Sequence, residues 1–297
     1  MKEESRERKE QQAPAATGIL YMVSTPIGNL EDLTPRAARI LKEVDLIAAE
    51  DTRLTRKLLA YLGIQQRIIS YYREKEQERA ELLLDFLKNG AKIAVVSDAG
   101  TPGLSDPGGV LVAKAVAAGI QVVPVPGVSA CLAALVASGL PTDRFVFEGF
   151  LPRKTKEKKA RLAALAEEER TIVLYEAPHR LVETLELLVA QLGPDRPVVI
   201  ARELTKRFEE FWRGSLADAV RVWAERDVRG EFTLVLAGRP AEAKAEPTAA
   251  DYEHFYREIQ ERCRAGEKAS AVIRAIARRE SLSRSALYQY YQKRKGG

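Results

Sequence analysis

A glycine- and proline-rich loop between an apolar strand and a helix constrains this chain more than any other feature. Residues 92–96, Lys-Ile-Ala-Val-Val, have the pattern of a buried strand, and a helix-favouring segment follows at residues 110–116. The loop at residues 97–109 reads Ser-Asp-Ala-Gly-Thr-Pro-Gly-Leu-Ser-Asp-Pro-Gly-Gly. In α/β proteins such a loop at the carboxyl end of a strand holds a ligand, because glycine allows close backbone approach and proline limits the order lost on binding. We therefore expect Asp98 to face a ligand.

Strand and helix patterns alternate through the first half of the chain, which predicts a mostly parallel sheet. Apolar strands are expected at residues 19–23, 44–49, 68–71, 92–96 and 121–125. Helices are expected from Thr34-Pro35, through residues 58–62, at 74–89 and at 110–116. Thr34 is a good N-cap, and Pro35 suits the first helical turn. Because turn residues alone carry no function, the loop at residues 97–109 also fits an ordinary strand-to-helix connection.

The pattern changes near residues 140–143, where a second α/β lobe with more antiparallel pairing is expected. Its strands are predicted at residues 145–150, 171–175, 197–201, 209–216 and 230–236, with a helix at 179–192. The last two strands look like neighbours in a hairpin-rich sheet. Residues 154–159 form a strongly basic stretch between the first two of these strands.

A length of 297 residues allows about two domains with well-buried cores. We expect a disordered leader, two α/β lobes, a linker and a basic helical domain, at residues 1–17, 18–138, 139–240, 241–250 and 251–297 respectively. Helices near 251–264, 267–279 and 283–294 would build the last domain. Ser283 is a good N-cap for the third of these helices, and the spacing is compatible with a helix-turn-helix.

Composition excludes several classes of protein. No run approaches the eighteen or so apolar residues that a membrane span needs, and residues 1–17 lack the apolar core of a signal peptide. The two cysteines, Cys131 and Cys263, lie far apart, which fits a reducing cytosol better than a disulfide scaffold. The two histidines form no cluster, so a metal site is not expected. Neither a dinucleotide fingerprint nor a phosphate-binding P-loop is present.

Basic residues gather at the C-terminal end of the chain. The last 36 residues carry ten basic residues and two acids, a net charge of +8, while the chain as a whole carries +5. The preceding residues therefore sum to −3. A basic appendage on a near-neutral body indicates a polyanionic partner, although a tail kept basic for solubility has the same composition.

Six short motifs occur in the same order as in one known family. They are Val23-Ser24-Thr25-Pro26-Ile27-Gly28-Asn29-Leu30, Ala49-Glu50-Asp51-Thr52-Arg53, Ser97-Asp98-Ala99-Gly100-Thr101-Pro102-Gly103, Tyr175-Glu176-Ala177-Pro178-His179-Arg180, Ala201-Arg202-Glu203-Leu204-Thr205-Lys206 and Gly230-Glu231-Phe232-Thr233-Leu234-Val235. With these motifs the chain resembles the small-subunit ribosomal RNA 2′-O-methyltransferase I family, a branch of the tetrapyrrole methylase superfamily. The resemblance covers residues 18–240 and extends to the C-terminal helix-turn-helix.

The resemblance implies an enzyme that uses S-adenosylmethionine to methylate the ribose 2′-hydroxyl of a cytidine in the decoding region of 16S ribosomal RNA. It also implies two α/β lobes of the tetrapyrrole methylase type with the cofactor in the cleft between them, and a homodimer. The expected partner is 16S ribosomal RNA in the small ribosomal subunit, and the expected location is the cytoplasm, with neither a membrane nor a metal involved.

The motifs at strand ends supply the expected cofactor-binding residues. They are Pro26 and Gly28 on the floor of the pocket, Asp98, Ala99, Gly100 and Thr101 at the methionine and ribose, and Ser129, Ala130, Tyr175, Ala201 and Thr233 around the adenine and sulfur. For Ser129 and Thr233, an ordinary helix start and ordinary strand packing are the alternative explanations.

Charged residues in the same motifs are the candidates for chemistry and for substrate binding. A carboxylate near the ribose hydroxyl would accept its proton, and the candidates are Glu50, Asp51 and Glu203. Arg53, Glu176, Arg202 and Lys206 are expected to bind substrate, the cations by contacting RNA phosphates. Glu–Arg pairs near strand ends are also common as structural ion pairs, which is the alternative for each of these residues.

One segment departs from the family pattern. Many relatives carry His-Asn-Glu after the third strand, where this chain has Tyr72-Arg73-Glu74-Lys75-Glu76. This departure puts any role of that histidine in question here, and shaping the substrate surface is the role that stays open to the segment.

Two other functions remain open from the sequence. A methylase of a porphyrin or corrin precursor is one, but a small macrocycle requires neither the basic stretch at 154–159 nor the basic tail. A non-catalytic RNA-binding protein with a methylase-like core is the other, and the intact loop at 97–109 stands against it.

Overall fold

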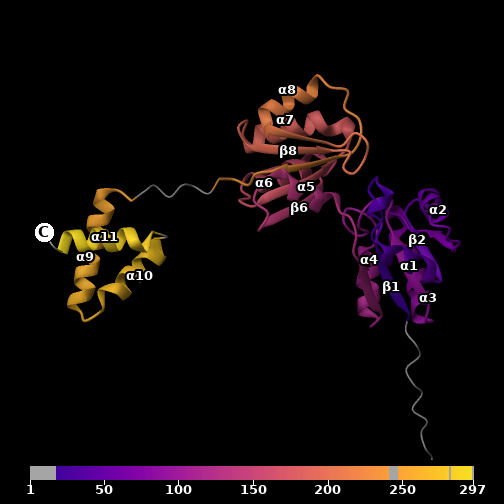
Figure 1. Ribbon diagram of the computed structural model, residues 1–297, viewed down its shortest axis with the longest axis horizontal. Helices are drawn as coiled ribbons and strands as arrows, with labels where there is room; N and C mark the ends of the chain where they lie inside the picture. The colour runs from indigo at the N-terminus through magenta and orange to yellow at the C-terminus, as the bar shows by residue number, and fades with distance from the viewer. Residues whose placement is uncertain (1–17, 241–246, 281, 296–297) are drawn as a thin grey trace, which may run out of the picture. The chain divides into compact units, whose positions relative to one another are not determined.

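The computed structural model describes residues 18–240, 247–280 and 282–295, so the predicted leader and most of the predicted linker lie outside the described residues. One compact unit ends at Arg239 and a second begins at Pro240. The first unit contains two five-stranded sheets, and the second contains three helices (Figure 1). No helix within these described ranges is long and apolar enough to cross a membrane.

The first sheet is entirely parallel, where a mostly parallel sheet was predicted, and its order is β3-β2-β4-β1-β5. Its strands are β1 (Ile19–Val23), β2 (Leu46–Ala49), β3 (Ile68–Ser70), β4 (Lys92–Val96) and β5 (Gln121–Val125). Helices α3 (Glu76–Lys88) and α4 (Gly109–Ala117) cover one face, and α1 (Pro35–Glu43) and α2 (Thr52–Tyr61) cover the other. Both faces are therefore apolar, as a buried parallel sheet requires.

Local capping explains where the first helices begin. The Thr34 hydroxyl accepts the Ala37 N–H at 3.1 Å, and Pro35 occupies the first turn of α1, as predicted. Asp51 caps α2 in the same way, because its Oδ1 accepts the Arg53 N–H at 2.7 Å. Short 3₁₀ turns at Leu30–Asp32 (η1) and Arg73–Lys75 (η2) precede α1 and α3.

The second sheet has the order β6-β7-β10-β8-β9, in which only β6 and β7 are parallel. Its strands are β6 (Phe145–Phe150), β7 (Thr171–Glu176), β8 (Pro197–Arg202), β9 (Glu210–Ser215) and β10 (Phe232–Leu236). Antiparallel pairing was predicted for this lobe, but the prediction that β9 and β10 are neighbours is wrong. β8 lies between them, because β10 pairs with both β7 and β8.

Helices cover both faces of the second sheet (Figure 1). One face carries α6 (Thr155–Ala166), α7 (Leu181–Leu192, after the 3₁₀ turn η3 at Pro178–Arg180) and α8 (Leu216–Ala224). α8 was missed from the sequence; the Ser215 hydroxyl caps it by accepting the Asp218 N–H at 3.1 Å. The opposite face carries α5 (Ala130–Ser138), which follows β5 of the first sheet in the chain.

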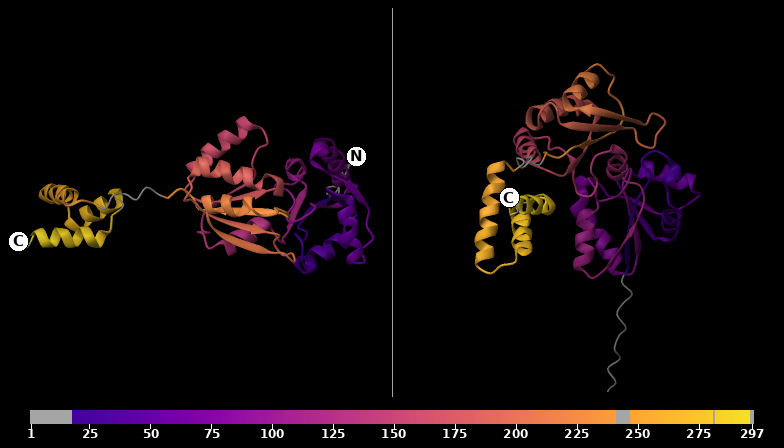
Figure 2. Two further views of the ribbon diagram at one scale, coloured as in Figure 1. Left: turned by 90° about the horizontal axis from the view of Figure 1, so that it is seen from above. Right: turned by 60° about the vertical axis from the view of Figure 1, so that its left-hand side comes forward.

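The second unit is a bundle of α9 (Ala249–Arg264), α10 (Ala269–Glu280) and α11 (Arg284–Lys295), close to the ranges predicted (Figure 2). Its own core contains Ile259, Val272, Ile273, Ile276 and Leu287, each at most 1% exposed. The Ser283 hydroxyl accepts the Ala286 N–H at 3.3 Å, so the predicted N-cap of α11 is confirmed.

The core of the second lobe depends on Trp223 in α8. This residue is fully buried, and its ring meets Phe232 of β10 edge-on at 5.3 Å. We expect Trp223→Ala to lower the free energy of unfolding by about 3–5 kcal/mol, because it leaves a large cavity. Urea unfolding followed by the fluorescence of Trp212, which lies in β9 of the same sheet, measures this change. Val116→Ala, at a residue 62% exposed, should change the free energy of unfolding by less than about 0.5 kcal/mol. Equal losses for Trp223→Ala and Val116→Ala would contradict the central role of Trp223 in this core.

Candidate functional site

A cavity of about 360 Å³ is lined by residues of both lobes. This volume lies within the range of small-molecule sites. The first lobe contributes Ile27, Glu50, Asp98, Ala99, Gly100, Thr101, Leu104, Ser105 and Asp106. Ser129 and Ala130 at the start of α5 follow, and the second lobe adds Phe150, Tyr175, Glu176, Ala177, Pro178, Leu204, Glu231, Phe232 and Thr233. The carboxyl end of β4 therefore meets a cavity, as its loop predicted.

A backbone bridge holds the loop after β4 in place. The Thr25 N–H donates to the Gly100 carbonyl at 2.8 Å, and the Gly100 N–H donates to the Thr25 carbonyl at 3.0 Å. Gly100 has a φ of +81°, which a residue with a side chain rarely adopts. The Ser24 and Thr101 hydroxyls add a hydrogen bond of 3.1 Å beside the bridge. The loop is thus fixed to the end of β1 before any ligand arrives.

Residues 72–76, the segment that departs from the family pattern, hold the end of this loop that leads into α4. Glu76 Oε1 accepts the Gly108 N–H at 2.8 Å and the Val110 N–H at 3.3 Å, at the start of α4. A carboxylate is favourable there because a helix N-terminus carries partial positive charge. Arg73 donates from Nη2 to the Ser105 carbonyl. The segment therefore positions the loop that lines the cavity.

Three carboxylates stand on one side of the cavity, and their pKa values are raised. Burial, with the negative charges of Asp106 and Asp98, raises the pKa of Glu50 from 4.5 to about 7. Burial raises the pKa of Asp106 to about 6, and Asp98 adds to this. Burial also raises the pKa of Asp98, whose Oδ1 accepts the Asp51 N–H at 2.8 Å. Crowded carboxylates of this kind favour a cationic ligand.

Aromatic side chains of the second lobe also line the cavity. Tyr175 of β7 meets the rings of Phe147 and Phe150 edge-on at 5.0 and 5.7 Å. Its hydroxyl accepts the Cys131 N–H at 3.1 Å, at the start of α5. The cavity therefore offers an apolar wall for a flat ring system beside a negatively charged side.

Strained backbone is concentrated around this cavity. Within the described residues, positive φ occurs at three residues other than glycine: Ser105 at 64°, Glu203 at 51° and Thr205 at 65°. Gly149 in β6 also has a positive φ, and a Cβ there would lie 2.6 Å from the Ser105 hydroxyl of the other lobe. Such strain persists only where the surrounding structure holds it and is typical of functional sites.

The cavity brings together most of the residues expected at the cofactor. Asp98, Ala99, Gly100, Thr101, Ser129, Ala130, Tyr175 and Thr233 line it. Ala201 does not, because it is 1% exposed and packs with Cys131 and Val199 between α5 and the second sheet. Pro26 and Gly28 line a second cavity of about 320 Å³ instead, between η1 and α2. The two cavities share Ile27, Asp98 and Ala99.

Of the three candidate catalytic carboxylates, only Glu50 lines the first cavity. Asp51 caps α2 and pairs with Arg53 at 2.7 Å, and these bonds lower its pKa to about 2. Glu203 pairs with Lys206 at 2.9 Å and accepts the Glu231 N–H at 3.0 Å. Burial opposes these interactions, but together they lower the pKa of Glu203.

The residues expected to bind substrate are mostly engaged within the protein. Glu176 lines the cavity, but it is 2% exposed and accepts the Thr184 hydroxyl at 2.7 Å. Arg202 donates from Nε to the Arg229 carbonyl at 2.8 Å, and Lys206 bridges Glu203 and Glu231. Arg53 pairs with Asp51, yet its side chain is 83% exposed and can exchange partners.

Sequence reasoning missed several lining residues. Asp106 stands within the loop at residues 97–109, so its motif was found while its role was not. Phe150 ends β6, and Leu204 and Glu231 belong to two of the six motifs. Their place in these motifs could have identified Leu204 and Glu231 as lining residues, whereas nothing in the sequence indicates that Phe150 lies at this site.

Comparisons with known proteins agree with this geometry. The family model described as Tetrapyrrole (Corrin/Porphyrin) Methylases matches residues 19–220. A Synechocystis protein named Ribosomal RNA small subunit methyltransferase I is 50% identical over 272 residues, 92% of this chain and 96% of that protein. A Bacillus subtilis protein of the same name is 46% identical, over 89% of this chain and 92% of that protein.

Solved structures share the two-lobed fold. Uroporphyrin-III C-methyl transferase from Thermus thermophilus, complexed with S-adenyl homocysteine, is 25% identical with a TM-score of 0.53. The match covers 74% of this chain and 97% of that one. The methyltransferase CobJ is 22% identical with a TM-score of 0.58, over 75% of this chain and 95% of that one, which supports the fold alone.

The raised pKa of Glu50 predicts how stability depends on pH. Between about pH 4.5 and pH 7, the folded protein retains a proton on Glu50 that the unfolded chain has released. Stability should therefore fall as the pH rises through this window, and Glu50→Gln should reduce that fall. Thermal unfolding from pH 5 to pH 8 measures this loss of stability. The control is Glu31→Gln, because Glu31 is an exposed carboxylate outside the cavity. Parallel profiles for the protein and Glu50→Gln would contradict the assignment.

Proposed function

Because the chain belongs to the ribosomal RNA small subunit methyltransferase I family of tetrapyrrole methylases, we propose that it methylates small-subunit ribosomal RNA with S-adenosylmethionine as donor. We place the acceptor at the ribose 2′-hydroxyl of a cytidine in the decoding region of 16S ribosomal RNA. The observation that carries this proposal is the identity of 50% over 92% of the chain, with the six motifs gathered at the lobe junction.

The first cavity suits the cofactor by chemistry as well as by volume. S-adenosylmethionine supplies an electrophilic methyl group and brings a sulfonium and an ammonium, so it carries net positive charge. Asp98 and Asp106 complement that charge, because each has a raised pKa that a nearby cation would lower. Tyr175 and Phe150 offer the apolar wall against which the adenine would pack.

We place the target nucleotide in the second cavity. It adjoins the first through Ile27, Asp98 and Ala99, and Lys57 lines it. Helix α2 along its side contains three cations and no acidic residue: Lys57 lines the cavity, Arg53 pairs with Asp51 just before the helix, and Arg56 lines a separate cavity. A polyanion is favoured on such a surface, and Leu54 and Tyr61, which are 44% and 64% exposed, offer apolar contacts to a base.

Among the carboxylates, we assign the general base to Glu50, which lines the first cavity beside Asp98, where the two cavities meet. A pKa of about 7 leaves it partly ionised at neutral pH and basic enough to accept a proton. Asp51 is a poor base because its pKa is about 2, and Glu203 is held by Lys206. We assign Glu176 a positioning role, because its carboxylate joins the end of β7 to α7 through Thr184.

A homodimer in the cytoplasm acting on small ribosomal subunits completes the proposal. The exposed side of α5 carries Leu132 and Val136, which are 52% and 73% exposed and lie four residues apart on one face. A second copy of the chain would bury these side chains. The basic helices of the C-terminal unit supply the charge that a ribosomal RNA surface attracts.

Cofactor affinity should depend on the charge of Asp98. Asp98→Asn retains an oxygen for the Asp51 N–H but removes the negative charge. We expect calorimetry to show S-adenosylmethionine binding about 10- to 100-fold weaker, the range for removal of a charged hydrogen bond. Gly100→Val is a poorer test, because its positive φ would add backbone strain. Asp85→Asn, at an exposed residue of α3, is the control, and equal affinity of the unaltered protein, Asp98→Asn and Asp85→Asn would remove Asp98 from the site.

Methyl transfer should require the assembled or partly assembled subunit. The two cavities and the C-terminal unit offer more surface than one short stem can contact. We expect radioactive methyl from the labelled cofactor to enter the RNA of purified small subunits and to be nearly absent from a short naked hairpin. The modified nucleoside, identified by mass spectrometry, should be a 2′-O-methylcytidine. Equal labelling of both RNAs, or a methylated base, would contradict the proposal.

A further inference from the structure

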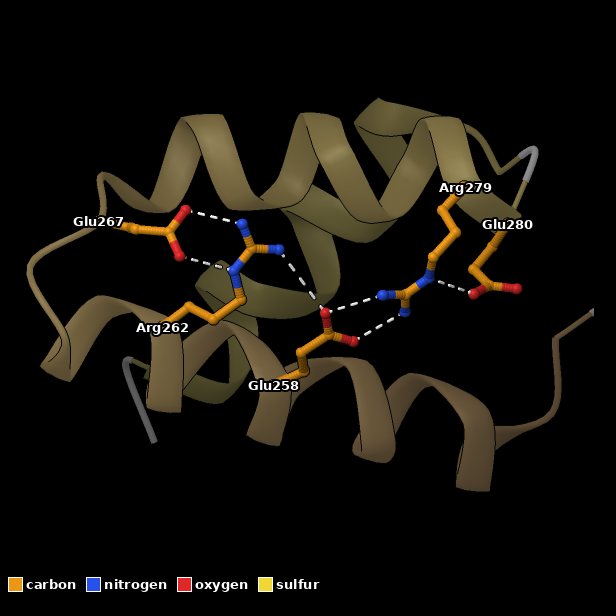
Figure 3. A network of polar contacts seen from close by, with 5 residues as sticks. All are labelled: Glu258, Arg262, Glu267, Arg279 and Glu280. Atoms are coloured by element: carbon orange, nitrogen blue, oxygen red, sulfur yellow. Dashed lines mark hydrogen bonds and ion pairs between the residues drawn. The ribbon is translucent and has the colours of Figure 1, made fainter.

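Ion pairs divide the basic residues of the C-terminal unit into two groups. Glu258 of α9 stands between two arginines, 3.7 Å from Arg262 and 2.8 Å from Arg279 (Figure 3). Arg262 also pairs with Glu267, and Arg279 with Glu280, each at 2.7 Å (Figure 3). Both guanidiniums are therefore engaged, and their partner Glu258 holds a lowered pKa, chiefly through its hydrogen bond from Arg279.

A third arginine is engaged in the same way. Arg294 of α11 donates to Glu253 at 2.7 Å, and the Tyr290 hydroxyl donates to the same carboxylate at 3.0 Å. On the side of the unit where α9 meets α10 and α11, these three arginines therefore already have carboxylate partners.

From residue 262 onward, the other basic side chains have no ion-pair partner among residues 247–280 and 282–295. They are Arg264, Lys268, Arg274, Arg278, Arg284, Lys293 and Lys295. Arg274 and Arg278 lie one turn apart on α10, exposed and away from its buried Val272, Ile273 and Ile276. Arg284 opens α11 directly after the turn, so free cations stand on both sides of the α10–α11 turn.

Only one tyrosine of α11 is available beside these cations. Tyr291 is 9% exposed and packs on Tyr256 at 5.8 Å. Tyr290 stacks on Tyr252 at 5.1 Å and hydrogen-bonds Glu253. Tyr288 is 46% exposed and lies one turn after Arg284, on the same side of α11.

We propose that the surface formed by Arg274, Arg278, Arg284 and Tyr288 is the RNA-binding face of the C-terminal unit, with Tyr288 stacking on an unpaired base and the arginines contacting flanking phosphates. This rests on the proposed function for the identity of the RNA. Basic residues flanking an exposed aromatic ring are the usual chemistry for unpaired RNA. The engaged arginines, Arg262 and Arg279, already have carboxylate partners and contribute little to binding.

Two double variants of the full chain, each removing two positive charges, test the division. Binding to purified small subunits is measured over a salt series for Arg274→Gln/Arg278→Gln and for Arg262→Gln/Arg279→Gln. The first pair should reduce the slope of log K against log salt by about 2, because each arginine neutralises one phosphate. The second pair should leave the slope unchanged, and circular dichroism checks that both variants are folded. Equal slopes for the two pairs would overturn the proposal.

Tyr288 is tested separately with a matched pair. Tyr288→Leu should weaken binding to an RNA stem-loop about 5- to 100-fold, the range for removal of one base-stacking side chain, while Tyr288→Phe should retain it. Neither variant should alter binding to a blunt RNA duplex. Equal binding of Tyr288→Leu and Tyr288→Phe to the stem-loop would overturn the stacking role. Because these are binding measurements, they can fail while methyl transfer to the subunit, the test of the proposed function, succeeds.

Discussion

The packing of α5 against the second sheet is the interaction on which the site depends. The helix leaves the first sheet after β5, yet its buried residues Cys131, Ala134 and Leu135 pack with Val173, Val199 and Val235. Ile27 from the loop after β1 joins the same cluster, so the apolar core runs from one lobe into the other. The Tyr175 hydroxyl bonds the backbone at the start of α5. Because the two walls of the cavity come from different lobes, this packing sets the distance between the acidic side and the aromatic side.

The charged and strained residues around the cavity lower the stability of the fold, and the same residues form the binding site. Glu50, Asp98 and Asp106 are crowded and partly buried, and their ionised forms would be better solvated in water, as their raised pKa values show. Ser105, Glu203 and Thr205 add backbone strain around the same cavity. The surroundings compensate with the Thr25–Gly100 bridge and with Glu76, which holds two N–H groups at the start of α4. A cationic ligand would relieve the carboxylate repulsion, which links occupancy of the site to stability.

Ion pairing, rather than the total net charge, decides which basic side chains of this chain can bind an anion. The C-terminal tail has a net charge of +8, yet Arg262, Arg279 and Arg294 are already paired with carboxylates. In the second lobe, Lys158 of the basic stretch pairs with Glu183 at 2.9 Å and Lys154 with Glu157 at 3.2 Å. The cations without such partners on α2 and α10 are therefore the ones that can meet phosphate without first breaking an ion pair.

The sequence by itself determined the motifs and most of the elements, because strand periodicity, caps and turn residues are local, although it missed α8. It predicted the parallel first sheet, the caps at Thr34 and Ser283, and the place of Asp98 beside a ligand cavity. It could not determine that β10 inserts between β7 and β8, that Ala201 is buried beneath α5, or that Asp51 and Glu203 are held by cations. These features are interactions between residues far apart in the chain or between side chains with several possible partners. Only the tertiary structure chooses among such partners, because burial and charge pairing depend on which segments meet.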